Sequence, residues 1–237
     1  MYKYLLFDLD HTLLDFDCAE DRALDALLAH EGFTDVSAFK DYYIPMNKGM
    51  WRDLEKGNIT KPELVNTRFS RAFAHFGVEK DGKELAQLYQ HFLSQQGQTY
   101  EGARELLADL KQAGYQIYAA TNGVTAIQQG RLERSGLLPY FDAIFISEQL
   151  ATAKPSLDFF EKVSERIAGF SKEKTLMIGD SLTADMAGGA AFGIDTAWYN
   201  SKQLDNNSPV QPTYTLSDYS DLRALLLRSC KKVAFDD

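Results

Sequence analysis

The sequence has few cysteines, no long hydrophobic run and fewer basic than acidic residues, and each shortage excludes a class of protein. Only Cys18 and Cys230 are present, far apart and without metal-ligand spacing, which argues against a disulfide-built secreted protein. No run of about 18 apolar residues is available to cross a bilayer. Asp8 and Asp10 interrupt the first apolar segment, which is therefore not typical of a signal peptide. We expect a cytoplasmic protein with no membrane partner.

The formal net charge is −9, from 25 basic and 34 acidic residues. A surface of this charge does not favour a nucleic-acid polymer as partner. It is compatible with a small anionic substrate if the site itself supplies positive charge, from lysine, backbone N–H groups or a metal ion. The composition, 45% hydrophobic and 25% charged, is that of an ordinary globular protein.

Several common catalytic motifs are absent from the sequence. There is no Gly-rich phosphate-binding loop and no nucleophile-elbow serine. The four histidines share no spacing with acids or cysteines that indicates a metal site (His11, His30, His75 and His91). We therefore expect any catalytic chemistry to rest on other residue types.

Short apolar runs rich in β-branched and aromatic residues alternate with helical patterns along the chain. The runs are residues 2–7, 115–120, 143–147, 175–179 and 196–199, and the helical patterns are residues 102–114, 124–136, 156–169 and 182–193. This alternation predicts an α/β fold with a parallel sheet covered on both faces. After a polar loop at 201–213, we expect a short strand and a last helix at about 218–230 to close the domain.

A long insertion separates the first two predicted strands. It spans roughly 100 residues, far more than a crossover between parallel strands needs. Three amphipathic helical patterns lie within it, at residues 18–32, 60–77 and 83–97. The middle pattern opens with a capping box formed by Thr60 and Glu63. We predict a helical domain with its own small core over residues 15–98, inserted into an α/β domain of residues 1–14 and 99–237.

Polar side chains follow the ends of four predicted strands. They are Asp8 and Asp10 after the first, Thr121 and Asn122 after the second, Lys154 shortly after the third, and Asp180 and Asp185 after the fourth. In an open parallel sheet, ligands bind at the carboxyl ends of the strands. Taken alone, each motif is typical of a turn, a helix cap or a solvated side chain. Their joint placement at successive strand ends favours a functional site.

The charges at this edge predict a divalent cation. Several neighbouring carboxylates cannot all stay ionised without a counter-charge. Oxygen ligands with no His or Cys nearby favour Mg²⁺ over zinc. Thr121, the N–H groups around Asn122, and Lys154 would then bind the remaining oxygens of a phosphate group. Pro155 is expected at the first helical position, where it would fix how Lys154 leaves its helix. The residues alone do not show which carboxylate attacks.

Four segments, DLDHT, TNG, KPSLDFF and GDSLTAD, resemble the signature motifs of the haloacid dehalogenase-like hydrolase superfamily in order, spacing and strand-end placement. Longer stretches from Thr121 and Gly179 are similar to bacterial cytosolic nucleoside 5′-monophosphate phosphatases of the pyrimidine 5′-nucleotidase type. The resemblance covers nearly the whole chain, more loosely in the insertion. It implies a Rossmann-like three-layer core with an inserted all-helical cap domain. One departure is His11, where many relatives carry Gly, and this costs backbone freedom.

The resemblance also implies roles for the first two acids. Asp8 would be the nucleophile and a metal ligand, attacking phosphorus to form an aspartyl-phosphate. Asp10 would be the general acid/base, and its main-chain carbonyl would bind Mg²⁺. Asp10 would protonate the departing oxygen and later take a proton from the water that splits the intermediate. It must therefore carry a proton at the start.

The other motif residues would hold the phosphoryl group and the metal ion. Thr121, Asn122 and Lys154 would bind phosphate, and Lys154 would stabilise the charge on the transferring group. Asp180 would ligate Mg²⁺ directly, and Asp185 would support it from beside.

The resemblance predicts a Mg²⁺-dependent phosphate monoester hydrolase acting on a small phosphorylated metabolite, with a nucleoside 5′-monophosphate as the expected substrate. A phosphatase of a small sugar phosphate or of glycolate phosphate is an alternative, as is a phosphosugar mutase, which shares every core motif. Cleavage of a carbon–halogen bond needs neither Mg²⁺ nor an acid at Asp10, so a 2-haloacid dehalogenase is disfavoured. A non-catalytic phosphate-binding protein is disfavoured because no motif residue is missing. The sequence does not decide between monomer and homodimer.

Substrate choice is expected to depend on residues 41–57, where aromatic and polar side chains concentrate. Tyr43, Asn47 and Trp51 are candidates for stacking on a nucleobase and bonding its edge. The alternative is that these side chains form the core of the helical insertion, and the sequence leaves both interpretations open.

Overall fold

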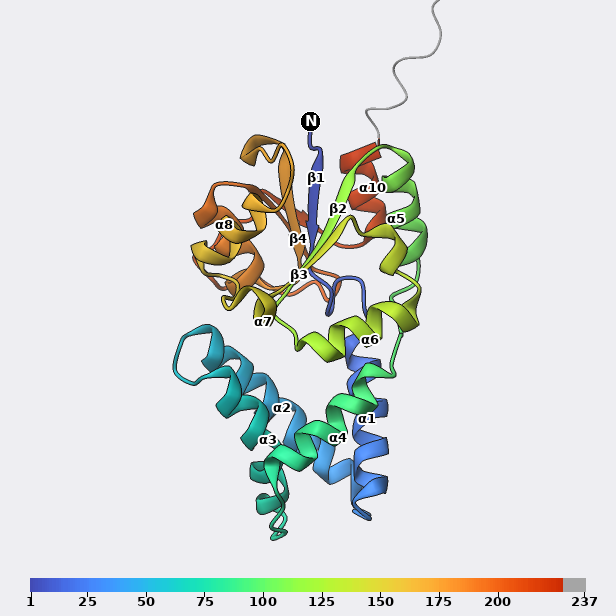
Figure 1. Cartoon of the computed structure of the whole chain (residues 1–237), viewed down its shortest axis with the longest axis vertical. Helices are drawn as coiled ribbons and strands as arrows, with labels where there is room; N and C mark the ends of the chain where they lie inside the picture. Colours follow the sequence, from blue (N-terminus) through green and yellow to red (C-terminus); the bar gives the residue numbers. More distant parts are fainter. Residues whose placement is uncertain (228–237) are drawn as a thin grey trace, which may run out of the picture. The chain divides into compact units, whose positions relative to one another are not determined.

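The structure is a computed structural model that describes residues 1–227 and forms two compact units (Figure 1). The first unit comprises Met1–Asp15, Thr99–Thr125 and the chain from Ser135 onward. The second comprises Phe16–Gln98 and Ala126–Arg134. The sequence analysis assigns residues 126–134 to the α/β domain, whereas in the structure they group with the helical unit.

A six-stranded parallel sheet forms the centre of the first unit. Its strands lie in the order β3-β2-β1-β4-β5-β6, and every neighbouring pair is parallel. Their bounds are β1 Tyr4–Phe7, β2 Gln116–Thr121, β3 Ala143–Ile146, β4 Thr175–Gly179, β5 Asp195–Tyr199 and β6 Tyr214–Leu216. The predicted α/β, Rossmann-like fold is confirmed. The central strands β1 and β4 are buried along their whole length, which is why their sequences are apolar without alternation.

Helices cover both faces of this sheet. Figure 1 shows α5 (Ala103–Gln112) and α10 (Tyr219–Leu227) on one side and α8 (Leu157–Glu165) on the other. Helix α9 (Ala187–Phe192) packs on α8, where the rings of Phe160 and Phe192 stack with centroids 5.7 Å apart. The shorter turns are α7 (Ser147–Leu150), the 3-10 turns η1 (Leu138–Tyr140) and η2 (Lys172–Lys174), and one π-helical turn, η3 (Leu182–Met186).

The second unit is helical. It contains α1 (Phe16–His30), α2 (Val36–Glu55), α3 (Lys61–His75), α4 (Gly82–Ser94) and most of α6 (Thr125–Ser135). Its core is rich in buried aromatic rings, namely Phe39, Tyr43, Phe69, Phe73 and Tyr89. Thr60 caps α3, since its side chain accepts the Glu63 N–H at 3.3 Å, as the capping box predicts. Helix α2 is not predicted by the sequence patterns, because Pro45 lies in its interior and proline disfavours that position.

One expectation at the start of a helix is wrong. Helix α8 begins at Leu157, so Pro155 lies before the helix and is not in its first position. The Lys154–Pro155 peptide is cis. The predicted last helix at 218–230 is α10, which is described to Leu227, and its remaining predicted residues lie outside the described part of the chain. Cys230 also lies outside it. Within residues 1–227, no helix combines the length and apolarity needed to span a membrane.

Candidate active site

The sheet order brings three motif residues to neighbouring strand ends. β1 lies between β2 and β4, with Phe7 in register with Ala119 on one side and Ile178 on the other. Asp8 follows β1 directly, and its N–H donates to the Ile178 carbonyl at 2.8 Å. Thr121 ends β2 and Asp180 follows β4. Backbone pairing in the sheet therefore brings these residues to one edge.

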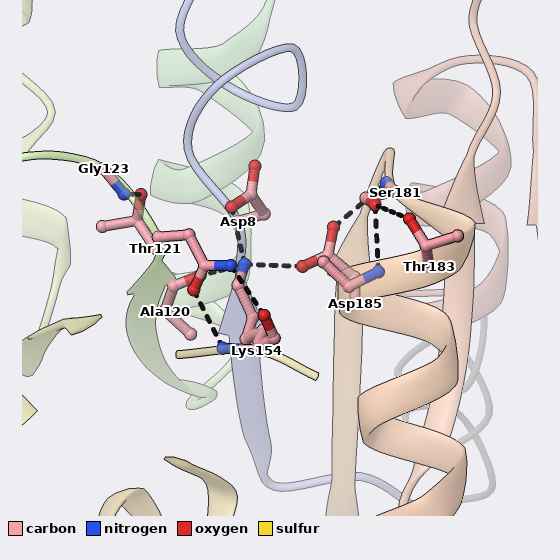
Figure 2. A network of polar contacts seen from close by, with 10 residues as sticks. Asp8, Ala120, Thr121, Gly123, Lys154, Ser181, Thr183 and Asp185 are labelled. Carbon is pink, nitrogen blue, oxygen red and sulfur yellow. Dashed lines mark hydrogen bonds and ion pairs between the residues drawn. The ribbon is translucent and has the colours of Figure 1, made fainter. Parts of the chain in front are cut away.

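Lys154 is the polar centre of this edge (Figure 2). Its Nζ donates to Asp8 Oδ1 at 2.7 Å, to Asp185 Oδ1 at 2.5 Å and to the Ala120 carbonyl at 2.6 Å. Since an ammonium group has three N–H donors, all of them are used. The residue is only 3% exposed. A cation buried this deeply is fixed in position and is held against the side chain expected to be the nucleophile.

Burial and neighbouring charges shift the pKa values of Asp8 and Lys154. Burial raises the pKa of Asp8 to about 7; the Lys154 ammonium opposes this rise, and the charges of Asp185 and Asp10 add to it. Burial alone would lower the pKa of Lys154, but the charges of Asp185 and Asp8 outweigh it and raise that pKa above its ordinary value. Lys154 therefore remains an ammonium at neutral pH, as a group that stabilises phosphoryl charge must.

Three carboxylates lie close enough to hold one metal ion. One oxygen each of Asp8, Asp180 and Asp185 falls within 4.8 Å of the others. Burial raises the pKa of Asp180 well above its usual range, and the charges of Asp8 and Asp185 raise it further. A divalent cation would relieve this repulsion, and an all-oxygen donor set suits Mg²⁺. The residues present therefore fit a hard divalent cation.

Asp185 is the carboxylate whose oxygens are already engaged. Oδ1 accepts from Lys154, and Oδ2 accepts the Ser181 N–H at 3.1 Å. The Asp185 carboxylate can lie this close to β4 only because residue 179 is glycine. A Cβ at that position would lie 2.1 Å from Asp185 Oδ2. This geometry agrees with a supporting role for Asp185 and leaves Asp8 and Asp180 as the better candidates for direct ligation.

Trp198, on β5, is a site-supporting residue that the sequence analysis does not identify. Its indole Nε1–H donates to the main-chain carbonyl of Asp180 at 2.8 Å. The bond fixes the loop that carries Asp180. In the sequence, Trp198 appears only as an apolar residue of a buried strand, and nothing in its spacing reveals this contact.

Asn122 uses its side chain differently from the expectation. Its Nδ2 donates to the Lys154 carbonyl at 2.8 Å, and its Oδ1 accepts the Lys154 N–H at 2.9 Å. The amide is thus bonded to the Lys154 backbone, and its expected contact with phosphate stays a prediction. Thr121 is 1% exposed, and its Oγ1 accepts the Gly123 N–H at 3.1 Å (Figure 2).

Asp10 lies in a tight loop after β1. The Leu9 carbonyl accepts the N–H groups of the loop residues Thr12, Leu13 and Leu14. Asp10 is half-buried and forms an isolated β-bridge with Leu14. Next to it, His11 has a φ of 60°, in the left-handed region that glycine enters without strain. The loop holds the Asp10 charge near Asp8 and Asp180, and its acid/base role stays a prediction.

The three candidate specificity residues all lie on α2 in the second unit. Tyr43 is buried, and its ring stacks on Phe69 with centroids 4.9 Å apart. Asn47 is 2% exposed, and its Nδ2 donates to Glu20 Oε1 at 3.1 Å. Trp51 is half-buried. Their contact with substrate stays a prediction.

A buried lysine bonded to a strand-end aspartate, beside two more carboxylates on a parallel sheet, is the arrangement that the four motifs predict. The chain belongs to the haloacid dehalogenase-like hydrolase family, whose model matches residues 2–193. The predicted family membership is confirmed.

Within this family, the chain is similar to several particular proteins. The chain is 64% identical to pyrimidine 5′-nucleotidase PynA of Streptococcus pneumoniae, over 93% of this chain and 93% of the relative. It is 33% identical to pyrimidine 5′-nucleotidase YjjG of Escherichia coli, over 96% and 99%. A crystal structure of the HAD-hydrolase YfnB from Bacillus subtilis, bound to magnesium, matches with a TM-score of 0.91 at 42% identity, covering 95% of this chain and 99% of that one. The predicted resemblance to the nucleotidase branch is confirmed.

Proposed function

We propose that this protein is a Mg²⁺-dependent phosphate monoester hydrolase that acts on pyrimidine nucleoside 5′-monophosphates in the cytoplasm. The chemistry rests on one observation: the buried ammonium of Lys154 lies 2.7 Å from Asp8 Oδ1, beside the carboxylates of Asp180 and Asp185. With a divalent cation held among its carboxylates, such a cluster would suit a dianionic phosphoryl group, which needs positive charge around its oxygens and a fixed nucleophile. The substrate class rests on the likeness to PynA and YjjG.

The proposed reaction has two steps on the same carboxylate. Asp8 bonds to phosphorus as the ester bond breaks, and Asp10 gives its proton to the departing alkoxide. Water then attacks phosphorus, Asp10 takes the proton of that water, and the bond from phosphorus to Asp8 breaks, releasing inorganic phosphate. Lys154 holds Asp8 in position and stabilises charge on the transferring group, together with Thr121.

Asp8, Asp180 and the main-chain carbonyl of Asp10 would hold Mg²⁺. The ion would supply charge neutralisation for the carboxylates and for the phosphoryl oxygens. The donor set is the reason for this assignment, since the described cluster contains carboxylates but no His or Cys.

Choice between esters is assigned to the helical unit, through Asn47 with Tyr43 and Trp51. Their polar and aromatic groups suit a nucleobase, which presents a hydrogen-bonding edge and a flat face. The α/β site, by contrast, addresses only the phosphoryl group that every monoester shares.

Phosphate release from a panel of monoesters tests the proposal. With Mg²⁺ present, kcat/KM for UMP, CMP and dTMP should exceed kcat/KM for AMP, ribose 5-phosphate and glycolate phosphate. Removal of the metal with EDTA should abolish turnover, and Mg²⁺ should restore it. Sugar phosphates hydrolysed far faster than nucleotides would overturn the nucleotide assignment. Turnover that survives EDTA would overturn the metal assignment.

A further inference from the structure

Tyr219, the first residue of α10, bonds the loop that carries Asp10. Its hydroxyl donates to the main-chain carbonyl of Thr12 at 2.6 Å, and both residues are buried. The two residues are 207 positions apart in the sequence, so only the fold brings them together. Burial raises the pKa of Tyr219 above its ordinary value, so its hydroxyl keeps its proton and remains a donor at neutral pH.

Tyr219 is itself held in place by its helix and by the sheet. Asp218 Oδ1 accepts the N–H groups of Ser220 at 2.7 Å and of Asp221 at 3.2 Å. These bonds cap the start of α10, where a helix leaves N–H groups unpaired. The Tyr219 ring also stacks on Tyr199, at the end of β5, with centroids 5.1 Å apart. The hydroxyl of Tyr219 is therefore a fixed anchor for the loop.

The loop that it anchors is short and internally bonded. The Leu9 carbonyl accepts three N–H groups of the loop, among them that of Thr12 at 3.3 Å. The His11 N–H donates to the Leu14 carbonyl at 3.0 Å. Asp10 lies within this set of bonds, two residues before Thr12. Because the bonds leave little slack between the two residues, a displacement of Thr12 is passed on to Asp10.

The position of Asp10 matters because a proton donor works only within hydrogen-bond reach of the departing oxygen. The charge of Asp10 acts on both Asp8 and Asp180, so its carboxyl lies near the other acids of the site. A displacement of about 1 Å in a catalytic geometry can lower a rate by about a hundredfold. Holding this loop in place therefore affects the reaction as well as the fold.

We infer that Tyr219 is a positioning residue for Asp10. Its bond to the Thr12 carbonyl holds the loop so that the Asp10 carboxyl can give its proton to the departing alkoxide. This inference rests on the proposed function, in which Asp10 is the general acid and base. Tyr219 acts through the loop and is not assigned a contact with substrate. A purely structural role would stabilise the fold without favouring one leaving group over another, and this difference can be measured.

The test compares kcat/KM for UMP and for p-nitrophenyl phosphate in the wild-type protein and in Tyr219→Phe, at saturating Mg²⁺. UMP releases an alkoxide, which needs a proton, whereas p-nitrophenolate is a stable anion that leaves without one. For Tyr219→Phe, the value for UMP should fall by about tenfold and the value for p-nitrophenyl phosphate by less than about twofold. Both reactions need the folded site, so the ratio of the two values does not depend on the folded fraction.

Asp10→Asn and Tyr115→Phe are the comparison variants. Asp10→Asn removes the acid itself, so kcat/KM for UMP should fall by about a hundredfold or more, and the value for p-nitrophenyl phosphate far less. Tyr115→Phe removes a bond of the same kind from α10, since the Tyr115 hydroxyl donates to the Leu226 carbonyl at 2.7 Å. Tyr115 precedes β2, at the opposite edge of the sheet from Asp8. This variant should keep the wild-type ratio of the two values.

The outcomes separate the inference from the proposed function. If Asp10→Asn loses both activities equally, or the wild-type protein hydrolyses neither ester, the proposed acid fails and its positioning fails with it. If Asp10→Asn is selective but Tyr219→Phe lowers both values equally, or lowers neither, the positioning inference alone is overturned. A changed ratio in Tyr115→Phe would also overturn it, because loosening α10 would then be sufficient. Selective loss for UMP in Tyr219→Phe, with the wild-type ratio in Tyr115→Phe, supports the inference.

Discussion

The side-chain amide of Asn122 bonds both polar backbone groups of Lys154, with Nδ2 2.8 Å from the carbonyl oxygen and Oδ1 2.9 Å from the nitrogen. Asn122 follows β2, and Lys154 lies in the connection between α7 and α8. The amide therefore fixes the backbone of Lys154, while Asp8, Ala120 and Asp185 fix its ammonium. The backbone and the ammonium group of Lys154 are held by separate sets of bonds, and together these fix the position of its charge.

Asn122→Ala removes both bonds to the Lys154 backbone. We expect kcat to fall by about tenfold to a hundredfold, because displacing a charge-stabilising group by about 1 Å has effects of this size. Asn122→Asp keeps the acceptor and loses the donor, so its kcat should fall between those of the wild-type and alanine proteins. Phosphate release at saturating substrate measures the effect. Asn58→Ala, in an exposed turn of the other unit, is the control. A wild-type kcat in Asn122→Ala would show that the ammonium contacts suffice.

Asp180→Asn should weaken Mg²⁺ binding without destabilising the fold. In EDTA the variant should be at least as stable as the wild-type protein, because it removes one of three crowded carboxylates. Mg²⁺ should raise the wild-type Tm, with about 2.7 kcal/mol of stabilisation at a hundred times the dissociation constant. The variant should respond far less. Thermal unfolding with and without Mg²⁺ makes the comparison, and equal responses would remove Asp180 from the metal site.

Gly179→Ala and Gly49→Ala should have opposite effects on stability. A Cβ at Gly179 would lie 2.1 Å from Asp185 Oδ2, so Asp185 must move, at a cost of about 1–3 kcal/mol and with loss of activity. A Cβ at Gly49, within α2, meets nothing within 4 Å and should stabilise the helix by about 0.5–1 kcal/mol. Urea unfolding at a fixed Mg²⁺ concentration gives both values. Equal stabilities for the two variants would refute the crowding at Asp185.

Glu20 predicts how stability changes with pH. Burial raises its pKa to about 7 in the folded protein, against about 4.3 in an unfolded chain. The folded state therefore binds the proton more tightly, so this contribution is fully present below about pH 4.3 and is lost as pH rises through about 7. The loss amounts to about 3–4 kcal/mol. Glu20→Gln cannot titrate and should gain stability relative to the wild-type protein by about this amount between pH 4 and pH 8.

Urea unfolding of both proteins at intervals of pH measures this difference. The nearby charges of Arg68, Lys48 and Asp17 remain in both proteins, so the comparison isolates Glu20. A difference that does not change with pH would show that Glu20 titrates normally.

The residues at the strand ends were predictable for two reasons. Each strand has a local sequence pattern, and the geometry of a parallel sheet brings the strand ends together. Short apolar runs mark the strands, and parallel strands bring their carboxyl ends to one edge, so Asp8, Thr121 and Asp180 could be grouped before any coordinates. Lys154 lies beyond α7 and not at the end of β3, so the same rule indicates its position less directly.

Contacts between residues distant in the chain were not predictable in this way. Trp198 bonds a backbone carbonyl that any residue would offer, so no side-chain pattern reveals it. Glu20 and Arg68 meet only through the packing of α1, α2 and α3. Helix α2 itself was missed because tertiary packing tolerates Pro45 where local propensity does not. Pairing across helices, unlike alignment of strand ends, leaves no periodic trace in the sequence.

The most direct test is steady-state release of inorganic phosphate from UMP by the wild-type protein and by Asp8→Asn, both with saturating Mg²⁺. The wild-type protein should turn over, and Asp8→Asn should release no phosphate above the rate without enzyme while keeping the wild-type circular dichroism spectrum. Measurable turnover by folded Asp8→Asn would contradict the assignment of Asp8 as the nucleophile.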